Sequence, residues 1–235
     1  MVPRHLQPYA GCVHSYSARH LDPDEARAYR SKFERSWTRR LSHKRERKLI
    51  LRAYGKARHL APLQPRVLDY PCGAGRFSPA FASSAGEFTI ADHSPAMIEL
   101  AKEALGASGF DLSRLHSVVG DAREMPLDEE SIDLACCIRL LHHFKEQDDR
   151  LRILRGFRRV CRGPLVCTYL SADSPKQWIH QLRCQLERRE SRRSTLSAQE
   201  LATEAQAAGY RLAQTWSLSG WFSGQCVALL TPMTR

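Results

Sequence analysis

The sequence lacks several features that would assign it to a specialised class of protein. No run of eighteen apolar residues occurs, and the first ten residues contain no apolar core of the signal-peptide type. None of the eight cysteines forms a C-x-x-C pair, which argues against a zinc site, and no internal repeat is present. We therefore expect a soluble, cytoplasmic protein with no integral membrane segment, no bound metal, and buried, reduced thiols.

The chain does contain enough apolar residues for a core, and its charge is unevenly distributed. Its 235 residues are 43% hydrophobic, which fits one domain with added segments. Residues 25–58 carry thirteen Lys and Arg against three Glu, and residues 150–193 carry twelve against three acids. Residues 59–149 carry only seven against fifteen acids. This distribution favours an anionic partner or acceptor, although solvated Arg-rich helices produce the same pattern.

The stretch at residues 66–77 is the one from which the fold and function of the chain are argued. It reads R-V-L-D-Y-P-C-G-A-G-R-F, which predicts a strand, a tight turn and the start of a helix. Gly73 and Gly75 allow backbone angles that other residues resist, and they let a ligand lie against the main chain. The third glycine of a dinucleotide-binding fingerprint is missing, so the stretch alone is weak evidence for a function.

Three later segments continue the pattern of a strand followed by an acidic or polar turn. F-T-I-A-D-H-S-P at 88–95 predicts a strand ending at Asp92 and a helix that begins with Ser94 as its N-cap. S-V-V-G-D-A at 117–122 and I-D-L-A-C-C-I at 132–138 follow. An acid at the end of the second strand binds ribose hydroxyls in doubly wound nucleoside-binding folds.

Taken in order, these four motifs resemble the class I S-adenosylmethionine-dependent methyltransferases, of the small type 11 methyltransferase-domain kind. The resemblance extends from about residue 66 to residue 170, with weaker matches beyond. It implies an α/β fold with a doubly wound, Rossmann-like seven-stranded sheet, closed by an antiparallel pair at about 210–218 and 225–230. It also implies S-adenosyl-L-methionine as the cofactor. Where the family usually has D-x-G-x-G-x-G, Pro71 replaces the first glycine.

The resemblance assigns cofactor contacts to particular positions. Asp92 is expected to accept hydrogen bonds from the ribose hydroxyls, and Asp121 from the amino group of adenine. The expected contacts, from the methionine moiety through the ribose to the adenine, are Asp69, Gly73 and Gly75, then Asp92, and then His93, Met97, Asp121 and Ala122.

The segment after the strand at 132–138 is expected to begin the acceptor site. By resemblance, Ile138 and Arg139 contact the methionine end of the cofactor. His142 and His143 follow, and a histidine near the transferred methyl group can deprotonate a hydroxyl acceptor. The alternative is that they pack beneath the next helix. Cys136 and Cys137 fall within the strand, so we expect buried thiols rather than nucleophiles.

Two segments exceed the minimal fold. They are an N-terminal arm and helical cap at residues 1–60, and a basic helical insertion at 171–195 within a methyltransferase domain of residues 61–235. Periodicity predicts one helix from Asp22 to about Leu41 and a second from Arg45 to Leu60. We expect the cap and the insertion, which contains Trp178, to enclose an acceptor pocket near Arg139 and His143.

Two classes of acceptor fit these features. The first is a small-molecule or lipid-like, possibly anionic acceptor that receives the methyl group by in-line transfer. The second is RNA, held through its phosphates by the basic segments. The segment after the fourth strand reads C-I-R-L-L-H-H-F and lacks the [D/N/S]-P-P-[Y/F/W] signature of base-amine methyltransferases. The first class is therefore favoured. The sequence carries no signal for an oligomeric state.

Overall fold

A computed structural model describes residues 37–175, 179, 183–184, 186–187, 194–219 and 223–234. The N-terminal arm and the first predicted helix, up to residue 36, lie outside the described residues. Trp178 and most of the predicted insertion lie outside them as well.

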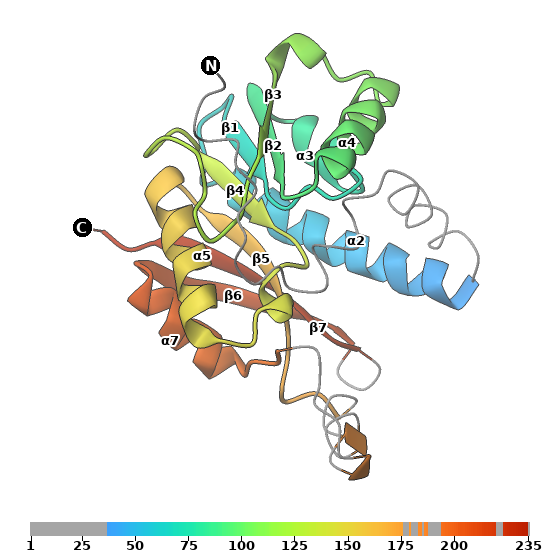
Figure 1. Ribbon diagram of the computed structural model, residues 1–235, viewed down its shortest axis with the longest axis vertical. Coiled ribbons are helices and arrows are strands. Elements are labelled where there is room, and N and C mark those ends of the chain that lie inside the picture. Colours follow the sequence, from blue (N-terminus) through green and yellow to red (C-terminus); the bar gives the residue numbers. More distant parts are fainter. Residues whose placement is uncertain are drawn as a thin grey trace, which may run out of the picture.

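A seven-stranded mixed sheet runs through the centre of the molecule (Figure 1). Its strands are β1 (Arg66–Asp69), β2 (Glu87–Asp92), β3 (Leu115–Val119), β4 (Leu134–Cys137), β5 (Leu165–Leu170), β6 (Tyr210–Ser219) and β7 (Ser223–Pro232). The spatial order is β3-β2-β1-β4-β5-β7-β6. Strands β1 to β5 pair in parallel, whereas β7 pairs antiparallel with both β5 and β6. This confirms the predicted doubly wound, Rossmann-like methyltransferase sheet and its terminal antiparallel pair.

Helices cover both faces of the sheet. They are α2 (Trp37–Arg58), α3 (Ser78–Ala82), α4 (Pro95–Ala107), α5 (Gln147–Val160) and α7 (Ala198–Ala207), with short 3-10 turns η3 (Leu112–Arg114) and η4 (Leu141–His143). Buried apolar residues of α2 and α3, with Ile98, Ala101 and Leu105 of α4, belong to one cluster, and those of α5 and α7 belong to another. Within the described part of the chain, none of these helices is long and apolar enough to cross a membrane.

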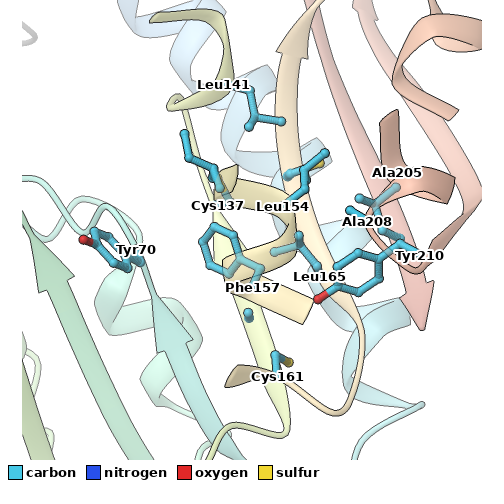
Figure 2. Packing of buried hydrophobic residues seen from close by; sticks show 14 of the residues in the cluster. Tyr70, Cys137, Leu141, Leu154, Phe157, Cys161, Leu165, Ala205, Ala208 and Tyr210 are labelled. Atoms are coloured by element: carbon cyan, nitrogen blue, oxygen red, sulfur yellow. The ribbon is translucent and has the colours of Figure 1, made fainter. Parts of the chain in front are cut away.

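The central strands are buried on both faces, which explains why they read as continuous apolar runs. In β4, Leu134 and Cys136 belong to the cluster beneath α2, whereas Ala135 and Cys137 belong to the cluster beneath α5 and α7. Figure 2 shows the second cluster, with Phe157 of α5 packed among its neighbours. All seven cysteines among the described residues are buried, as predicted.

Helix α2 differs from the prediction of two helices. It is continuous from Trp37 to Arg58, so the predicted break between residues 41 and 45 was wrong. Residues 41–45 contain no proline or glycine that would interrupt the backbone hydrogen bonds of the helix. Ile50 and Tyr54 are buried as predicted and pack in the cluster on the sheet. The division of the chain near residue 60 stays a prediction.

Candidate functional site

The turn after β1 brings the two predicted glycines to the carboxyl end of the sheet. Gly73 has a φ of +51° and Gly75 a φ of +72°, both in the region that favours glycine. A Cβ added at Gly73 would meet no atom within 4 Å, so the main chain there borders open space. A Cβ at Gly75 would lie 2.7 Å from Cα of Ala101 in α4. Gly73 thus leaves room for a ligand, whereas Gly75 lets α4 approach the turn.

Pro71 does not prevent the turn from forming. The Tyr70–Pro71 peptide bond is cis. The amide of Cys72 donates to the carbonyl of Ala91 at 2.9 Å, and the Tyr70 hydroxyl donates to the carbonyl of Gly120 at 2.7 Å. These contacts fasten the turn after β1 to the end of β2 and to the segment after β3.

Asp69 ends β1 as a fully enclosed carboxyl group. Its Oδ2 accepts a 2.6 Å hydrogen bond from the hydroxyl of Ser78, the first residue of α3. Burial raises the pKa of Asp69 to about 7; the Ser78 bond opposes this shift and the Asp92 charge adds to it. Ser78 was not singled out from the sequence, although a hydroxyl at the start of a helix after a strand-ending acid is a signal that could have identified it.

Asp92 joins the turn after β1 to the start of α4. Its Oδ2 accepts from the Gly73 amide at 2.9 Å, and its Oδ1 accepts from the Ser94 amide at 3.0 Å. The side chain of Ser94 caps α4 by accepting from the Met97 amide, as its position predicted. Two backbone donors therefore fix the orientation of the Asp92 carboxylate at the carboxyl end of β2.

Two more predicted cofactor residues lie beside Asp92 but differ in exposure. Met97 is buried and packs with Leu100, Ala74 and Ala96. His93 is exposed, and its proximity contributes to lowering the pKa of Asp121.

Asp121 follows β3 and is held by an arginine that the sequence analysis did not single out. Arg123 donates to both carboxylate oxygens, with Nη2 to Oδ2 at 2.6 Å, and its backbone amide donates to Oδ1 at 2.9 Å. Burial opposes ionisation of Asp121, but these Arg123 bonds outweigh it and leave the pKa below its ordinary value. Ala122 is buried beside it.

The loop after β4 carries the remaining predicted residues. Ile138 is buried, and Arg139 adopts a φ of +64°, which is uncommon for a residue other than glycine. The amide of Arg139 donates to Oγ1 of Thr168 in β5 at 2.6 Å. His142 is buried within η4, and its ring centroid lies 4.2 Å from that of His143.

A buried arginine holds this loop in place. Arg150 of α5 bonds both oxygens of Glu204 in α7, the closer at 2.6 Å, and both side chains are buried. The same guanidinium donates to the carbonyls of Phe144 and Lys145 and to the hydroxyl of Ser194. The Ser194 amide in turn donates to the His142 carbonyl at 2.9 Å. The end of the predicted insertion therefore lies against η4.

A second network, centred on Glu46 of α2, lies at the same edge of the sheet. Glu46 is buried, and its carboxylate accepts from Arg76 at 2.7 Å and from the Gln225 side chain at 2.6 Å. Burial raises the pKa of Glu46, but the charges of Arg76 and Arg139 outweigh this and lower it overall. Among the many basic residues of α2, nothing in the sequence marked its one buried acid as part of a site.

The structure therefore brings most predicted residues to one edge of the sheet. The turns after β1, β2 and β3 are linked by direct hydrogen bonds, and the Tyr70 amide joins the first of them to β4 through the Cys136 carbonyl. Cys136 and Cys137 are fully buried, and burial raises the pKa of both thiols, which agrees with their prediction as structural residues.

Comparisons with known proteins agree with this architecture. A family described as "Methyltransferase domain" matches residues 67–163. "Uncharacterized methyltransferase YcgJ" of Bacillus subtilis is 27% identical over 155 residues, which cover 65% of this chain and 60% of that protein. Demethylmenaquinone methyltransferase of Clavibacter sepedonicus is 30% identical over 123 residues, covering 50% of this chain and 47% of that protein. The chain thus spans about half to three fifths of the length of these relatives.

Solved structures share the fold at low sequence identity. Magnesium protoporphyrin IX methyltransferase from Synechocystis, with bound SAH, superimposes with a TM-score of 0.69 and 14% identity, covering 84% of this chain and 88% of that one. A methyltransferase from Methanosarcina mazei gives a TM-score of 0.62 at 16% identity, covering 75% and 96%. Together with the family match over residues 67–163 and the order of the strands, these results show that the chain contains a class I S-adenosylmethionine-dependent methyltransferase domain. The family predicted from the four motifs is confirmed.

Proposed function

We propose that this protein transfers the methyl group of S-adenosylmethionine to a small-molecule or lipid-like acceptor that carries a negative charge, and that it acts in the cytoplasm. The observation that best supports the acceptor class is the anchoring of both extra segments at the carboxyl end of the sheet. Glu46 of α2 is bonded to Arg76 and Gln225, and the end of the insertion is bonded to His142. Walls at these places enclose a small acceptor better than an extended one.

The residues at the strand ends fit the proposed cofactor. The open space beside the Gly73 backbone is where a ligand can approach the main chain, and the oriented Asp92 carboxylate suits ribose hydroxyls. We assign Asp121 and Ala122, with His93 and Met97 on either side, to the adenine. Asp69, Gly75, Ile138 and Arg139 complete the assignment at the methionine end.

The chemistry requires little of the protein beyond alignment and exclusion of water. When bound, the sulfonium supplies an electrophilic methyl group, and its positive charge is lost on transfer. The residues of the chain then have to hold donor and acceptor in line in a dry pocket. We assign proton removal from a hydroxyl acceptor to His142 or His143, whose rings lie close together in the loop that begins the acceptor site.

The printed names of similar proteins support a small acceptor. Magnesium protoporphyrin IX, demethylmenaquinone, and sarcosine or dimethylglycine occur in the names of proteins similar to this chain. These compounds belong to those proteins, and for this chain they support only the choice of acceptor class.

The proposal is tested in two steps. Calorimetry with S-adenosylmethionine and its demethylated product should show binding of micromolar class; no heat and no thermal shift with either ligand would refute the proposal. Labelled donor should then be incubated with extracted metabolites, lipids and total RNA. Label in the metabolite or lipid fraction supports the proposed class, whereas label in RNA alone contradicts it.

If the acceptor is anionic, turnover should fall as salt rises, because attraction between exposed charges is screened over about 10 Å at 0.1 M salt.

A further inference from the structure

The outer face of α2 carries a row of exposed cations. Lys44, Lys48 and Arg52 recur every four residues, and Arg45 lies beside them; all four are exposed. At 3.6 residues per turn they lie on the side of the helix opposite its buried residues. We call these four residues the basic row. Figure 1 shows that the amino-terminal part of α2 extends past the sheet.

Within the described part of the chain, the basic row has no paired acid. Among the residues that the structure describes, no carboxylate forms an ion pair with any of its four members, and the one acid of this stretch, Glu46, is buried and bonded elsewhere. The first turn of α2 also contains no acid. Like charges four residues apart destabilise a helix, and so do cations near its N-terminus.

Elsewhere in the domain, cations are of two kinds. Arg66, Lys102, Arg123 and Arg150 are among those that pair with a carboxylate, whereas Arg152, Arg155 and Arg211 are exposed and form no ion pair among the described residues. The basic row differs from these in placing four exposed cations together on one helix face, where they repel one another. A polyanionic partner removes that repulsion by neutralising the row.

We propose that the basic row binds the phosphodiester backbone of a nucleic acid, independently of base sequence. Eight residues separate Lys44 from Arg52, so the row extends about 12 Å along the helix axis. In duplex geometry each strand presents one phosphate about every 3.4 Å of the axis, so the row spans roughly three to four phosphates of one strand, and fewer of an extended single strand. No exposed aromatic side chain lies in the described part of this face, so stacking on bases contributes nothing to recognition there.

A membrane surface fits the row less well. A helix that lies on a membrane needs an exposed apolar face to insert between lipids. The apolar face of α2 is already buried on the sheet, and none of the exposed large apolar side chains belongs to residues 43–58.

The row and the proposed acceptor site lie on opposite faces of α2. Glu46, which bonds Arg76 at the edge of the sheet, is buried, whereas Lys44 and Lys48 are exposed on the other face. This inference does not depend on the identity of the methyl acceptor, because binding is expected whether or not the nucleic acid is methylated.

The experiment measures binding of fluorescein-labelled 20-nucleotide poly(U) and oligo(dT) by anisotropy, between 50 and 200 mM KCl. The test variant is Lys44→Gln/Lys48→Gln/Arg52→Gln, which keeps good helix formers and removes repulsion. The control is Arg152→Gln/Arg155→Gln/Arg211→Gln, which removes the same charge from exposed positions on α5 and β6. Affinity for S-adenosylhomocysteine is measured for every protein.

The test variant should lose at least about tenfold in affinity at 100 mM KCl, and its salt slope should decrease by about 2, since each phosphate contact on a single strand contributes about 0.7. The affinity of the control variant for the same oligonucleotides should change less than threefold. Similar behaviour of poly(U) and oligo(dT) fits backbone binding. Equal losses in both variants would attribute binding to net charge and overturn the proposal. So would no binding by the native protein, or binding only to vesicles of phosphatidylglycerol. If the native protein does not bind S-adenosylhomocysteine, that result would count against the proposed function and not against this inference.

Discussion

The two halves of the proposed site are held together in different ways. The donor side, as we assign it, consists of the turns after β1, β2 and β3; Tyr70 reaches 50 positions to the Gly120 carbonyl, but the two carboxylates at the ends of β1 and β2 accept from residues close in the chain. Asp92 accepts from the amide of Gly73, 19 positions away, and Asp69 accepts from Ser78, 9 positions away. The acceptor side consists of the loop after β4, Glu46 and residues 194–196. There, Arg150 reaches 54 positions to Glu204, and Gln225 reaches 179 positions to Glu46.

This difference has energetic consequences. The donor side is set largely by backbone angles and by amides that donate to carboxylates, so most of its shape follows from short segments of chain. The acceptor side depends on buried charged side chains from distant segments. Burying each charge costs a large desolvation energy, and that cost is no longer offset if the partner of the charge is removed. The acceptor side should therefore be more sensitive to single side-chain changes, and less tied to donor affinity.

The largest expected effect follows from breaking the Arg150–Glu204 pair. Arg150→Met leaves Glu204 buried and unpaired and should lower the free energy of unfolding by about 3–5 kcal/mol. Arg123→Met, on the donor side, breaks a partly exposed pair and should cost only about 0–1 kcal/mol. Urea denaturation measures both. Arg150→Met/Glu204→Leu should recover part of the loss, and equal losses in the two single variants would refute the contrast.

The next effect concerns the pH dependence that Asp69 contributes. Because its pKa is raised to about 7 in the folded protein, the folded state keeps a proton that the unfolded chain releases. Asp69 therefore lowers the free energy of unfolding as pH rises from about 4 to 7, by a total on the order of 4 kcal/mol. Asp69→Asn should flatten this decline, whereas Asp111→Asn, at an exposed position, should not. Urea denaturation between pH 5 and 8 that gives parallel curves for native protein and Asp69→Asn would contradict the prediction.

A smaller effect is expected for donor binding. Asp92→Ala removes the carboxylate assigned to the ribose hydroxyls and should weaken binding of S-adenosylhomocysteine by about 1–3 kcal/mol. Calorimetry measures this change, and circular dichroism checks that α4 still forms, because Asp92 also accepts from the Ser94 amide. Asp92→Asn should bind with intermediate affinity. Unchanged affinity in Asp92→Ala would show that the ribose assignment is wrong.

The smallest effect is the one that best separates the two sides. Glu46→Gln keeps the shape of the side chain but removes its charge, and should lower the free energy of unfolding by about 1–2 kcal/mol. Affinity for S-adenosylhomocysteine should stay within about twofold, because Glu46 belongs to the acceptor side. A tenfold loss of affinity for S-adenosylhomocysteine, measured by calorimetry, would assign Glu46 to the donor side. The proposed division of the site would then be wrong.

The same division explains which features the sequence predicted. The strands, the glycine turn and the N-cap of α4 follow from local patterns, and the structure reproduces them. Glu46, Arg123 and Arg150 carry no local signal, because their importance comes from partners and burial that exist only in the folded chain. The continuous α2 was missed for a related reason, since polar residues 42–44 gave no apolar periodicity to connect its two halves. The cofactor and catalytic residues stay assignments that binding and turnover measurements have to test.

The reactivity of the buried thiols can be used to measure how often the structure around them opens. Burial raises the pKa of Cys167 to about 12, and Cys72 and Cys137 are shielded in the same way, so alkylating reagents react only after the surrounding structure separates. Cys72 lies in the glycine turn and Cys167 in the middle of β5. The ratio of their modification rates therefore measures how often the donor side opens on its own, compared with the unfolding of the whole domain.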